Sequence, residues 1–355
     1  HNVAIKLRNC EFYLPVHQSL NKNHFGSLIK EANKFSEVRK SKIRIEWNKS
    51  NKGEWDSLMI SIGKSNLLQS WSYGESKSRV EGWIVNRLIW YQDDKVVAFA
   101  QVLEKRLAKV LTVYRINRGP LFISNEAEIK STVIHQLLAF GNVFKGKILS
   151  VSLELQKNPE DFACHSQMNL ILPDSKGYSS IWVDMRLPLD IIRKSLNGKW
   201  RNMLVFAEKQ ELQVESGSSQ NLIDWVCEIH NENMNRKGFK GISSELLKSL
   251  ALEEDSDNPV IVYKAISQGL AVAAVCVAYH GNAATYLIGW TSQEGRRLKA
   301  NYLLLWEAIK ELQDKKKDWF DLGGIDREAT PGITGFKTGM NGELYSIVPT
   351  GWRVS

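Results

Sequence analysis

A short strand, a pair of glycines and a loop with one aromatic and one cationic side chain form the stretch best suited to chemistry. The strand is predicted at residues 319–322, Trp-Phe-Asp-Leu, and Gly323-Gly324 ends it. A glycine-rich loop follows and carries Phe336 beside Lys337. Backbone N–H groups and a fixed positive charge at a strand end can hold a phosphate or a developing oxyanion. The stretch therefore predicts a site that handles acyl or phosphate groups.

An amphipathic helix precedes this strand and must hold it in place. Leu304, Trp306, Ile309 and Leu312 recur at helical spacing, with charged residues between them. The charge run 314–318 then ends the helix. We expect the apolar stripe to pack on a sheet that contains the strand.

The order hairpin, third strand, helix, strand occurs twice in the chain. The copies are predicted at 87–122 and 260–292 (hairpin and third strand), 126–144 and 302–312 (helix), and 148–155 and 319–322 (strand). The letters differ between the halves, so the repeat is one of pattern. It predicts an α+β fold of tandem duplicated GNAT-like acyltransferase domains with mixed, mainly antiparallel sheets.

Composition fits a globular protein with polyanionic partners. The chain has 355 residues, 43% hydrophobic and 24% charged, enough for one large or two ordinary domains. A net charge of +8 favours tRNA, nucleotide diphosphates or anionic lipid headgroups as partners. The alternative is a charge that serves solubility alone, because the sequence has no long basic block.

Cysteine and histidine usage predicts neither a disulfide scaffold nor a metal site. The four cysteines, Cys10, Cys164, Cys227 and Cys276, are far apart and form no CxxC pair. The seven histidines show no ligand spacing either. No apolar run reaches the roughly 18 residues of a membrane-spanning helix. We expect reduced thiols, no metal and no cofactor.

Three further segments have weaker or more local signals. Residues 1–45 form a leading segment, with a strand expected at Val3–Leu14 and a helix at Phe25–Phe35. Ser65 or Asn66 can cap a helix that carries Lys77. Residues 189–210 are a strongly basic helix that is interrupted near Gly198.

These segments resemble the FemABX family, bacterial aminoacyl-tRNA-dependent transferases that add amino acids to the peptide of a peptidoglycan precursor. The resemblance covers about residues 46–350 and depends on the order and spacing of short motifs. The motifs are Leu68-Gln69-Ser70-Trp71 with Lys77, Arg118-Gly119-Pro120, Lys199-Trp200-Arg201-Asn202, the GWTS…LKANYLLLWEAIK stretch at 289–310, Asp321-Leu322-Gly323-Gly324 and Gly335-Phe336-Lys337.

The resemblance implies two GNAT-like domains, the first of them discontinuous. We expect domain 1 at 46–185, with 343–355 returning to it, and domain 2 at 186–342. Residues 1–45 are then an extension outside the resemblance. The coiled-coil arm of some members is absent, because 216–259 contains no run of three heptads.

By resemblance, Lys77 and Arg201 match positions at which the family holds the diphosphate of its nucleotide- or lipid-linked acceptor. Cations from separate elements suit a diphosphate, and arginine can fork onto two oxygens. Lys199 belongs to the same basic helix and is a further candidate, with a solvated helix face as its alternative. A phenol from Tyr263 or Tyr286 is expected to add a hydrogen bond.

Phe336 and Lys337 match the family's pair near the end of the tRNA acceptor arm. The Lys337 ammonium could stabilise the oxyanion that forms when an amine attacks the aminoacyl ester. The ester is already activated, so no serine or cysteine nucleophile is needed. The base could be substrate-borne, Asp321 or Asp326. The alternative for Asp321 is a strand-end residue that hydrogen-bonds the glycine turn.

The resemblance also implies partners and a location. They are aminoacyl-tRNA as donor, a UDP- or lipid-linked muropeptide as acceptor, peripheral contact with the membrane surface, a monomeric state, and a cytoplasmic location that includes the inner face of the membrane.

Two other functions stay open at this point. The first is a tRNA-independent GNAT-type acyltransferase that uses acyl-CoA or an acyl carrier. Such enzymes bind pyrophosphate on a glycine-rich loop, and the matching segment 293–298 has only Gly295, which argues against CoA there. The second is a binding protein that kept the fold without the catalysis.

Overall fold

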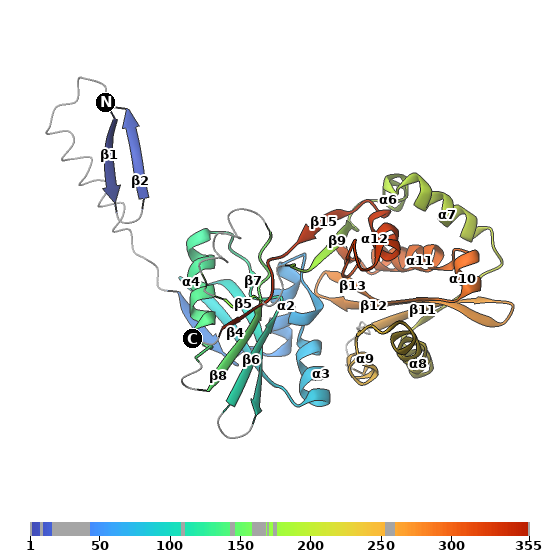
Figure 1. The fold of residues 1–355 in the computed structure, drawn as a ribbon, viewed down its shortest axis with the longest axis horizontal. Coiled ribbons are helices and arrows are strands. Elements are labelled where there is room, and N and C mark those ends of the chain that lie inside the picture. The colour runs from blue at the N-terminus through green and yellow to red at the C-terminus, as the bar shows by residue number, and fades with distance from the viewer. Residues whose placement is uncertain are drawn as a thin grey trace. The chain divides into compact units, whose positions relative to one another are not determined.

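The computed structural model describes residues 2–7, 10–15, 43–107, 111–142, 146–157, 168, 170–172, 176–252 and 260–353 (Figure 1). The chain divides into two compact units, His1–Lys42 and Ile43–Ser355. In the small unit, β1 (Asn2–Leu7) pairs antiparallel with β2 (Cys10–Pro15). The strand expected at Val3–Leu14 is therefore a hairpin. The helix expected at Phe25–Phe35 lies outside the described residues.

The first sheet of the large unit has the strand order β16-β8-β6-β5-β4-β3, with β7 paired to β5. Its strands are β3 (Arg44–Trp47), β4 (Ile84–Gln92), β5 (Lys95–Leu107), β6 (Leu111–Asn117), β7 (Leu121–Phe122), β8 (Lys147–Ser152) and β16 (Gly351–Arg353). All pairs are antiparallel except β6 with β8. The last strand of the chain thus completes the sheet of the first half.

Helices cover the first sheet unequally. Helix α4 (Ala127–Leu138) packs on one face with Ile129, Val133 and Leu137 in its core. The other face carries α2 (Lys52–Ser61), the 3-10 turn η1 (Leu67–Gln69) and α3 (Trp71–Glu81). The prediction that Ser65 or Asn66 caps this helix was wrong, because the chain first forms η1 and Ser70 then caps α3 by accepting the N–H of Tyr73. Figure 1 shows α4 and α3 on opposite sides of the strands.

The second sheet has the order β10-β11-β12-β13-β14-β9-β15. Its strands are β9 (Ser179–Asp184), β10 (Gln213–Gly217), β11 (Val260–Ser267), β12 (Leu270–His280), β13 (Ala283–Thr291), β14 (Trp319–Asp321) and β15 (Glu343–Ser346). Only β13 and β14 run parallel. The two sheets are mixed and mainly antiparallel, so the predicted fold class is confirmed.

Helices cover both faces of the second sheet (Figure 1). One face carries α6 (Leu189–Ser195), α7 (Gly198–Glu208), α10 (Gln293–Arg297) and α11 (Ala300–Asp314). The other carries α8 (Gln220–Lys237) and α9 (Ser244–Ala251). The expected helix at 302–312 is the core of α11, and the expected interruption near Gly198 separates α6 from α7. No helix of the described ranges is long and apolar enough to cross a bilayer.

The two halves repeat the same unit in detail. Both hairpins turn through two residues with positive φ, Asp93-Asp94 and Gln268-Gly269. Such turns match the twist of antiparallel strands. A third strand, a helix and a parallel strand then follow in each half.

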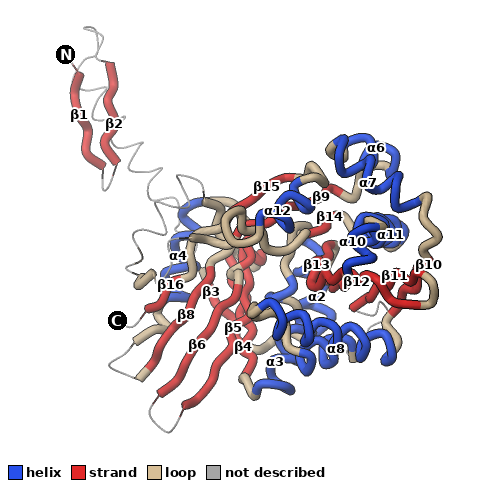
Figure 2. Tube along the Cα trace, turned by 45° about the vertical axis from the view of Figure 1, so that its right-hand side comes forward, coloured by secondary structure: helices blue, strands red, loops and turns tan. Residues whose placement is uncertain are grey.

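A shared apolar core joins the halves. Leu67, Tyr73 and Leu103 of the first half cluster with residues of α8, α9 and the second sheet, such as Val226 and Leu250. Figure 2 shows α3 and α8 on the same side of the molecule. The sequence-based domain boundaries stay a prediction. Strand β9 lies in the second sheet, although these boundaries assign residues 179–184 to domain 1.

The prediction for the segment that carries Phe336 and Lys337 was also wrong. Phe336 and Lys337 lie on a helix, α12 (Pro331–Thr338), and not on a glycine-rich loop. Pro331 occupies the first turn, where its missing N–H costs nothing.

Candidate functional site

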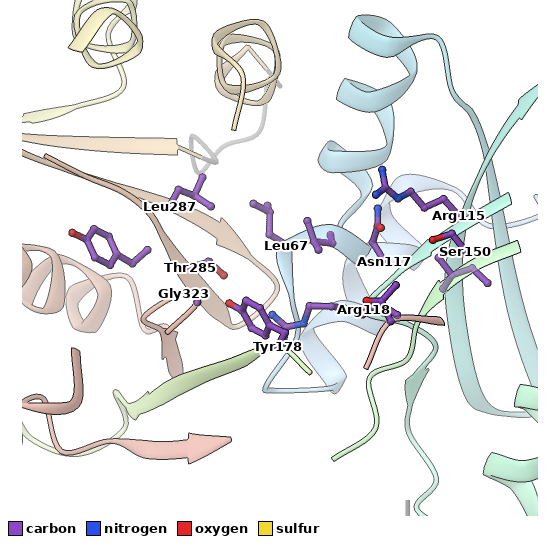
Figure 3. A pocket seen from close by; sticks show the side chains of 15 residues that line it. Leu67, Arg115, Asn117, Arg118, Ser150, Tyr178, Thr285, Leu287 and Gly323 are labelled. Carbon is purple, nitrogen blue, oxygen red and sulfur yellow. The ribbon is translucent and has the colours of Figure 1, made fainter. Parts of the chain in front are cut away.

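A cavity of about 420 Å³ lies where the parallel strand pairs of the two sheets face each other (Figure 3). The first half lines it with Leu67, Leu68, Arg115, Ile116, Asn117, Arg118, Ser150 and Ser152. The rest of the chain adds Tyr178, Thr285, Tyr286, Leu287, Gly323, Gly324 and Thr350. The cavity is therefore bounded by both halves, and the predicted Asp-Leu-Gly-Gly segment ends at its wall.

Strands β13 and β14 separate beside this cavity. They pair from Ala283↔Trp319 to Thr285↔Asp321, and β13 then continues without β14. Beyond Asp321 the chain turns away at Gly323, whose φ is +74°. A Cβ at Gly323 would lie 2.6 Å from the Tyr286 carbonyl oxygen, so a side chain does not fit there. Glycine thus permits the close approach that shapes this wall.

The amine of Lys337 is buried directly behind the glycine turn. Its Nζ donates to the carbonyl oxygen of Gly324 at 2.8 Å and lies 5.3 Å from the ring centre of Tyr286. Only 8% of the residue is exposed. Burial lowers the pKa of Lys337 to about 8, against the opposing effect of the Asp321 charge. The amine therefore adjoins two cavity-lining residues and is poised to change charge near neutral pH.

Asp321 is fully buried, and both of its oxygens accept hydrogen bonds. Oδ1 accepts the N–H of Gly323 at 2.9 Å and the hydroxyl of Ser180. Oδ2 accepts the Tyr345 hydroxyl at 2.8 Å and Nη1 of Arg118 at 3.3 Å. The turn-bonding alternative for Asp321 accounts for the Gly323 contact. The carboxylate orients the segment that holds Lys337, and it has no exposed surface.

Arg118 connects the two halves through this carboxylate. Its guanidinium forks onto Glu154 with two distances of 2.8 Å and also donates to the Tyr345 hydroxyl at 2.9 Å. Burial acts to lower the pKa of Arg118, but Glu154 and the other neighbours outweigh it and raise the pKa well above its ordinary value. The pairing follows the rule that a buried charge needs a partner.

The structure places most of the other predicted residues away from the cavity lining. Phe336 packs on Trp200 and Tyr302, with ring centres 6.0 and 4.9 Å away. Its carbonyl oxygen accepts the Trp200 indole at 3.0 Å. On the same helix as Trp200, Arg201 donates to the Lys194 carbonyl and Lys199 is exposed. Helix α7 thus packs against α12 through Trp200 and does not reach the cavity lining.

Lys77 and Tyr263 have protein partners. The Lys77 ammonium is buried and forms an ion pair with Glu81 one turn along α3. The hydroxyl of Tyr263 donates to Glu311 at 2.8 Å inside the second half. Of the two tyrosines left open by the sequence, Tyr286 is the one that lines the cavity. The roles predicted for all these residues stay predictions.

Sequence reasoning missed two contributors. Tyr345 belongs to residues 343–355, for which the sequence predicts only a return to domain 1, and Arg118 enters only through the motif Arg118-Gly119-Pro120. Arg115, which lines the cavity as Arg118 does, alternates with the core residues Tyr114 and Ile116. That period-two pattern was the available signal, because it sends Arg115 and Asn117 to the opposite face.

In the segment that would bind CoA phosphates, the N–H of Gly295 is already hydrogen-bonded within the protein. Ser292 caps α10 and accepts the N–H of Gly295 at 3.0 Å. A Cβ at Gly295 would lie 2.1 Å from the Val272 carbonyl oxygen, so the glycine is needed for packing. No cluster of three or more potential metal ligands occurs in the part of the chain that the structure describes.

Comparison with known proteins agrees with this architecture. The FemAB family model matches residues 210–349. No curated protein matches the sequence. Among solved structures, FemX has 15% sequence identity and a TM-score of 0.72, over 87% of this chain and 97% of FemX.

Two more distant structures share the fold. One is the C-terminal domain of a protein from Agrobacterium fabrum described as a lysylphosphatidylglycerol synthetase, with 12% identity and a TM-score of 0.52 over 83% of this chain and 92% of that chain. The other is a tandem GNAT protein from the clavulanic acid biosynthesis pathway, with 11% identity and a TM-score of 0.51 over 87% and 98%.

These findings confirm the resemblance to the FemABX family, the GNAT-like fold and the prediction of a transferase. They support aminoacyl transfer in general.

Proposed function

We propose that this protein is an aminoacyltransferase that moves an amino acid from aminoacyl-tRNA to an amine of a peptidoglycan precursor or a similar phosphate-linked acceptor. The observation that carries the proposal is the buried Lys337 amine beside the cavity between the halves, inside the segment that matches the FemAB family. The family implies both the donor and the class of acceptor.

The reaction forms one amide bond and breaks one ester bond. The acceptor nitrogen attacks the ester carbonyl carbon, and the carbonyl electron pair moves onto oxygen. The protonated Lys337 amine stabilises this oxyanion, an effect that is strong in a site shielded from water. The intermediate then expels the ribose oxygen of the tRNA, which takes a proton, while the new amide nitrogen loses one.

Asp321 serves this reaction as a positioning residue. Both of its oxygens already accept hydrogen bonds, and no part of it is exposed. Asp326 stabilises the loop before α12, because its Oδ1 accepts the N–H groups of Glu328 and Ala329. These contacts favour a substrate-borne base over either aspartate.

The remaining sequence-based assignments belong to this proposal. Lys77, Lys199 and Arg201 are offered as phosphate-binding residues, and Phe336 as the companion of Lys337 near the tRNA end. The proposal also includes a monomer in the cytoplasm with peripheral contact to the inner membrane face.

A transfer assay tests the proposal. The protein is incubated with tRNA charged with each of a panel of radiolabelled amino acids and with a UDP-linked muropeptide. We expect label in the muropeptide with at least one charged tRNA, and loss of transfer in Lys337→Ala but not in the exposed control Lys240→Ala.

Absence of transfer with every charged tRNA would overturn the proposal. If acetyl-CoA then stabilised the protein thermally and charged tRNA did not, the GNAT-type acyltransferase would replace it. Lys337→Ala with undiminished transfer would refute the role of the amine.

A further inference from the structure

The face of the first sheet that borders the cavity carries a polar strip that the proposed chemistry does not use. Arg115 pairs in register with Ser150, and Asn117 with Ser152, so the four side chains share one face. We call Arg115, Asn117, Ser150 and Ser152 the β6–β8 strip. The alternating residues, among them Ile116, point into the core under α4. Figure 3 shows Arg115, Asn117 and Ser150 on the first sheet, across the cavity from Thr285 and Leu287.

In the described part of the chain, the strip residues belong to none of the apolar clusters that pack under helices. Over β4 and β5, the face packs under α2, where Ile89 and Phe99 contact Trp55 and Met59. The strip on β6 and β8 instead lines the cavity. A buried sheet face would present apolar residues, so an arginine, an amide and two hydroxyls here indicate contact with water or a polar ligand.

An aromatic side chain extends the strip. Trp352 of β16 pairs directly with Ser150, which puts it on the same face, and 37% of it is exposed. An exposed tryptophan beside polar groups offers a flat surface for a sugar ring or a base.

The charge at the cavity wall is positive. Its lining contains Arg115 and Arg118 but no aspartate or glutamate. Glu154 and Asp321 neutralise Arg118. The side chain of Arg115 makes no hydrogen bond or ion pair with any residue that the structure describes. Arg87 on the same sheet face, by contrast, pairs with Glu75 at 2.8 Å. The charge of Arg115 is therefore available to a ligand.

We propose that the β6–β8 strip binds the phosphate or diphosphate of a phosphorylated sugar, with Arg115 as its main cation and Trp352 as a stacking surface. A guanidinium forks onto two phosphate oxygens, and the amide and hydroxyl groups supply uncharged donors. The inference rests on the proposed function, because it concerns recognition of the acceptor. A nucleotide-linked and a lipid-linked sugar share this chemistry.

The assignment differs from the one that the sequence motifs give. Lys77 is paired with Glu81, and Arg201 is engaged by the Lys194 carbonyl. Neither residue lines the cavity. Arg115, which no motif contains, is a cavity-lining cation whose side chain has no partner among the described residues.

Titration calorimetry on the full chain tests the inference with three probes: inorganic pyrophosphate, UDP-N-acetylglucosamine and farnesyl diphosphate. We expect Arg115→Gln to weaken every probe that binds by about tenfold to a hundredfold, as the loss of a charged hydrogen-bonding group does. Arg236→Gln removes an exposed arginine on α8 and is the control for net charge. Trp352→Ala should weaken only the UDP-sugar. Stronger binding of the UDP-sugar would identify a nucleotide-linked sugar as the ligand, and stronger binding of the prenyl diphosphate would identify a lipid-linked one.

Several results would overturn the assignment. They are no binding of any probe, equal weakening in Arg115→Gln and Arg236→Gln, or weakening in Arg201→Gln with none in Arg115→Gln. Because Arg115 is exposed and has no partner in the described part of the chain, its variants should fold, and Arg115→Lys gives a second test with intermediate affinity.

The transfer assay separates this inference from the proposed function. Arg115-dependent binding without any aminoacyl transfer would refute the function and leave the phosphate site. Lys337-dependent transfer with an unchanged KM for the acceptor in Arg115→Gln would refute the site and leave the function.

Discussion

The two halves contain the same strand–helix–strand unit but use its parallel strand pair differently. In the first half, β6 and β8 stay paired from Thr112↔Lys147 to Asn117↔Ser152. In the second half, β13 and β14 separate after Thr285↔Asp321, and the glycine turn follows. An intact ladder presents a row of side chains, whereas a broken ladder makes room for backbone groups and a buried amine.

Under the proposed function, this difference assigns a separate task to each half. The first half offers a cation and hydroxyls on a rigid sheet, which suits recognition. The second half offers Lys337 behind the Gly323-Gly324 turn, which suits the proposed chemistry. The ion pair between Arg118 and Asp321 fixes one half against the other. The predictions below test this division of labour.

Breaking the connection between the halves should have the largest effect. Arg118→Ala leaves the buried Asp321 and the partly buried Glu154 without their cation, and loss of one partner of a buried pair costs about 3–5 kcal/mol. We expect a lower free energy of unfolding by that amount in urea denaturation. As a control, Arg186→Ala removes a half-exposed partner of Asp184 and should cost little. Equal stability of the two variants would contradict the structural role of Arg118.

Removing the amine of the second half should affect turnover next. Lys337→Met keeps the apolar stem and deletes the oxyanion donor, which reduces kcat by about 10²–10³ for a typical donor. The acceptor KM should change little, because our proposal assigns recognition of the acceptor to the first half. A rise in KM with unchanged kcat would show that Lys337 binds substrate and does not stabilise the transition state.

The glycine turn gives a sharper test of the broken ladder. Gly323→Ala forces a Cβ to 2.6 Å from the Tyr286 carbonyl oxygen at a positive φ, so we expect a loss of about 1–3 kcal/mol in stability. Gly332→Ala on α12 meets no atom within 4 Å and is the matched control. The loss should appear in thermal unfolding of Gly323→Ala alone.

Much of this fold was predictable because its signals are local. The hairpin turns, the periodicity of α11 and the break near Gly198 depend on neighbouring residues, and the structure has them. Helix α12 was missed because Gly332 and Gly335 weaken helix propensity. Contacts distant in sequence, such as the bond from the Trp200 indole to the Phe336 carbonyl, stabilise it.

The candidate site was less accessible to sequence reasoning. A lysine at position 337 suggested oxyanion stabilisation. Its hydrogen bond to the Gly324 carbonyl and its burial, however, arise only from tertiary packing. The pairing of Arg118 with Asp321 joins the two halves across the cavity wall, and no local pattern encodes it. Burial and pairing of charges are properties of the folded chain, so residue types alone could not show that Lys77 is paired with Glu81 and that Arg115 lines the cavity.

The smallest expected effect is a shift in pH dependence that reports on the coupling between Asp321 and Lys337. The protonated amine is the proposed catalytic form, and burial lowers its pKa to about 8, so kcat should fall as pH rises through about 8. The negative charge of Asp321 raises this pKa, so Asp321→Asn should move the falling limb to lower pH. Lys337→Arg should remove the limb, because arginine stays charged.

The pH dependence of the free energy of unfolding independently tests whether the pKa of Lys337 is lowered in the folded protein. The ordinary pKa of lysine is 10.5, so between pH 8 and 10.5 the unfolded chain binds a proton at Lys337 that the folded chain has released. This lysine therefore makes the protein more stable as pH rises through that window. Lys337→Met should abolish that component of the difference between urea titrations at pH 8 and pH 10. An unchanged falling limb in Asp321→Asn, together with an unchanged pH dependence of stability in Lys337→Met, would show that the amine is not buried beside the aspartate in solution.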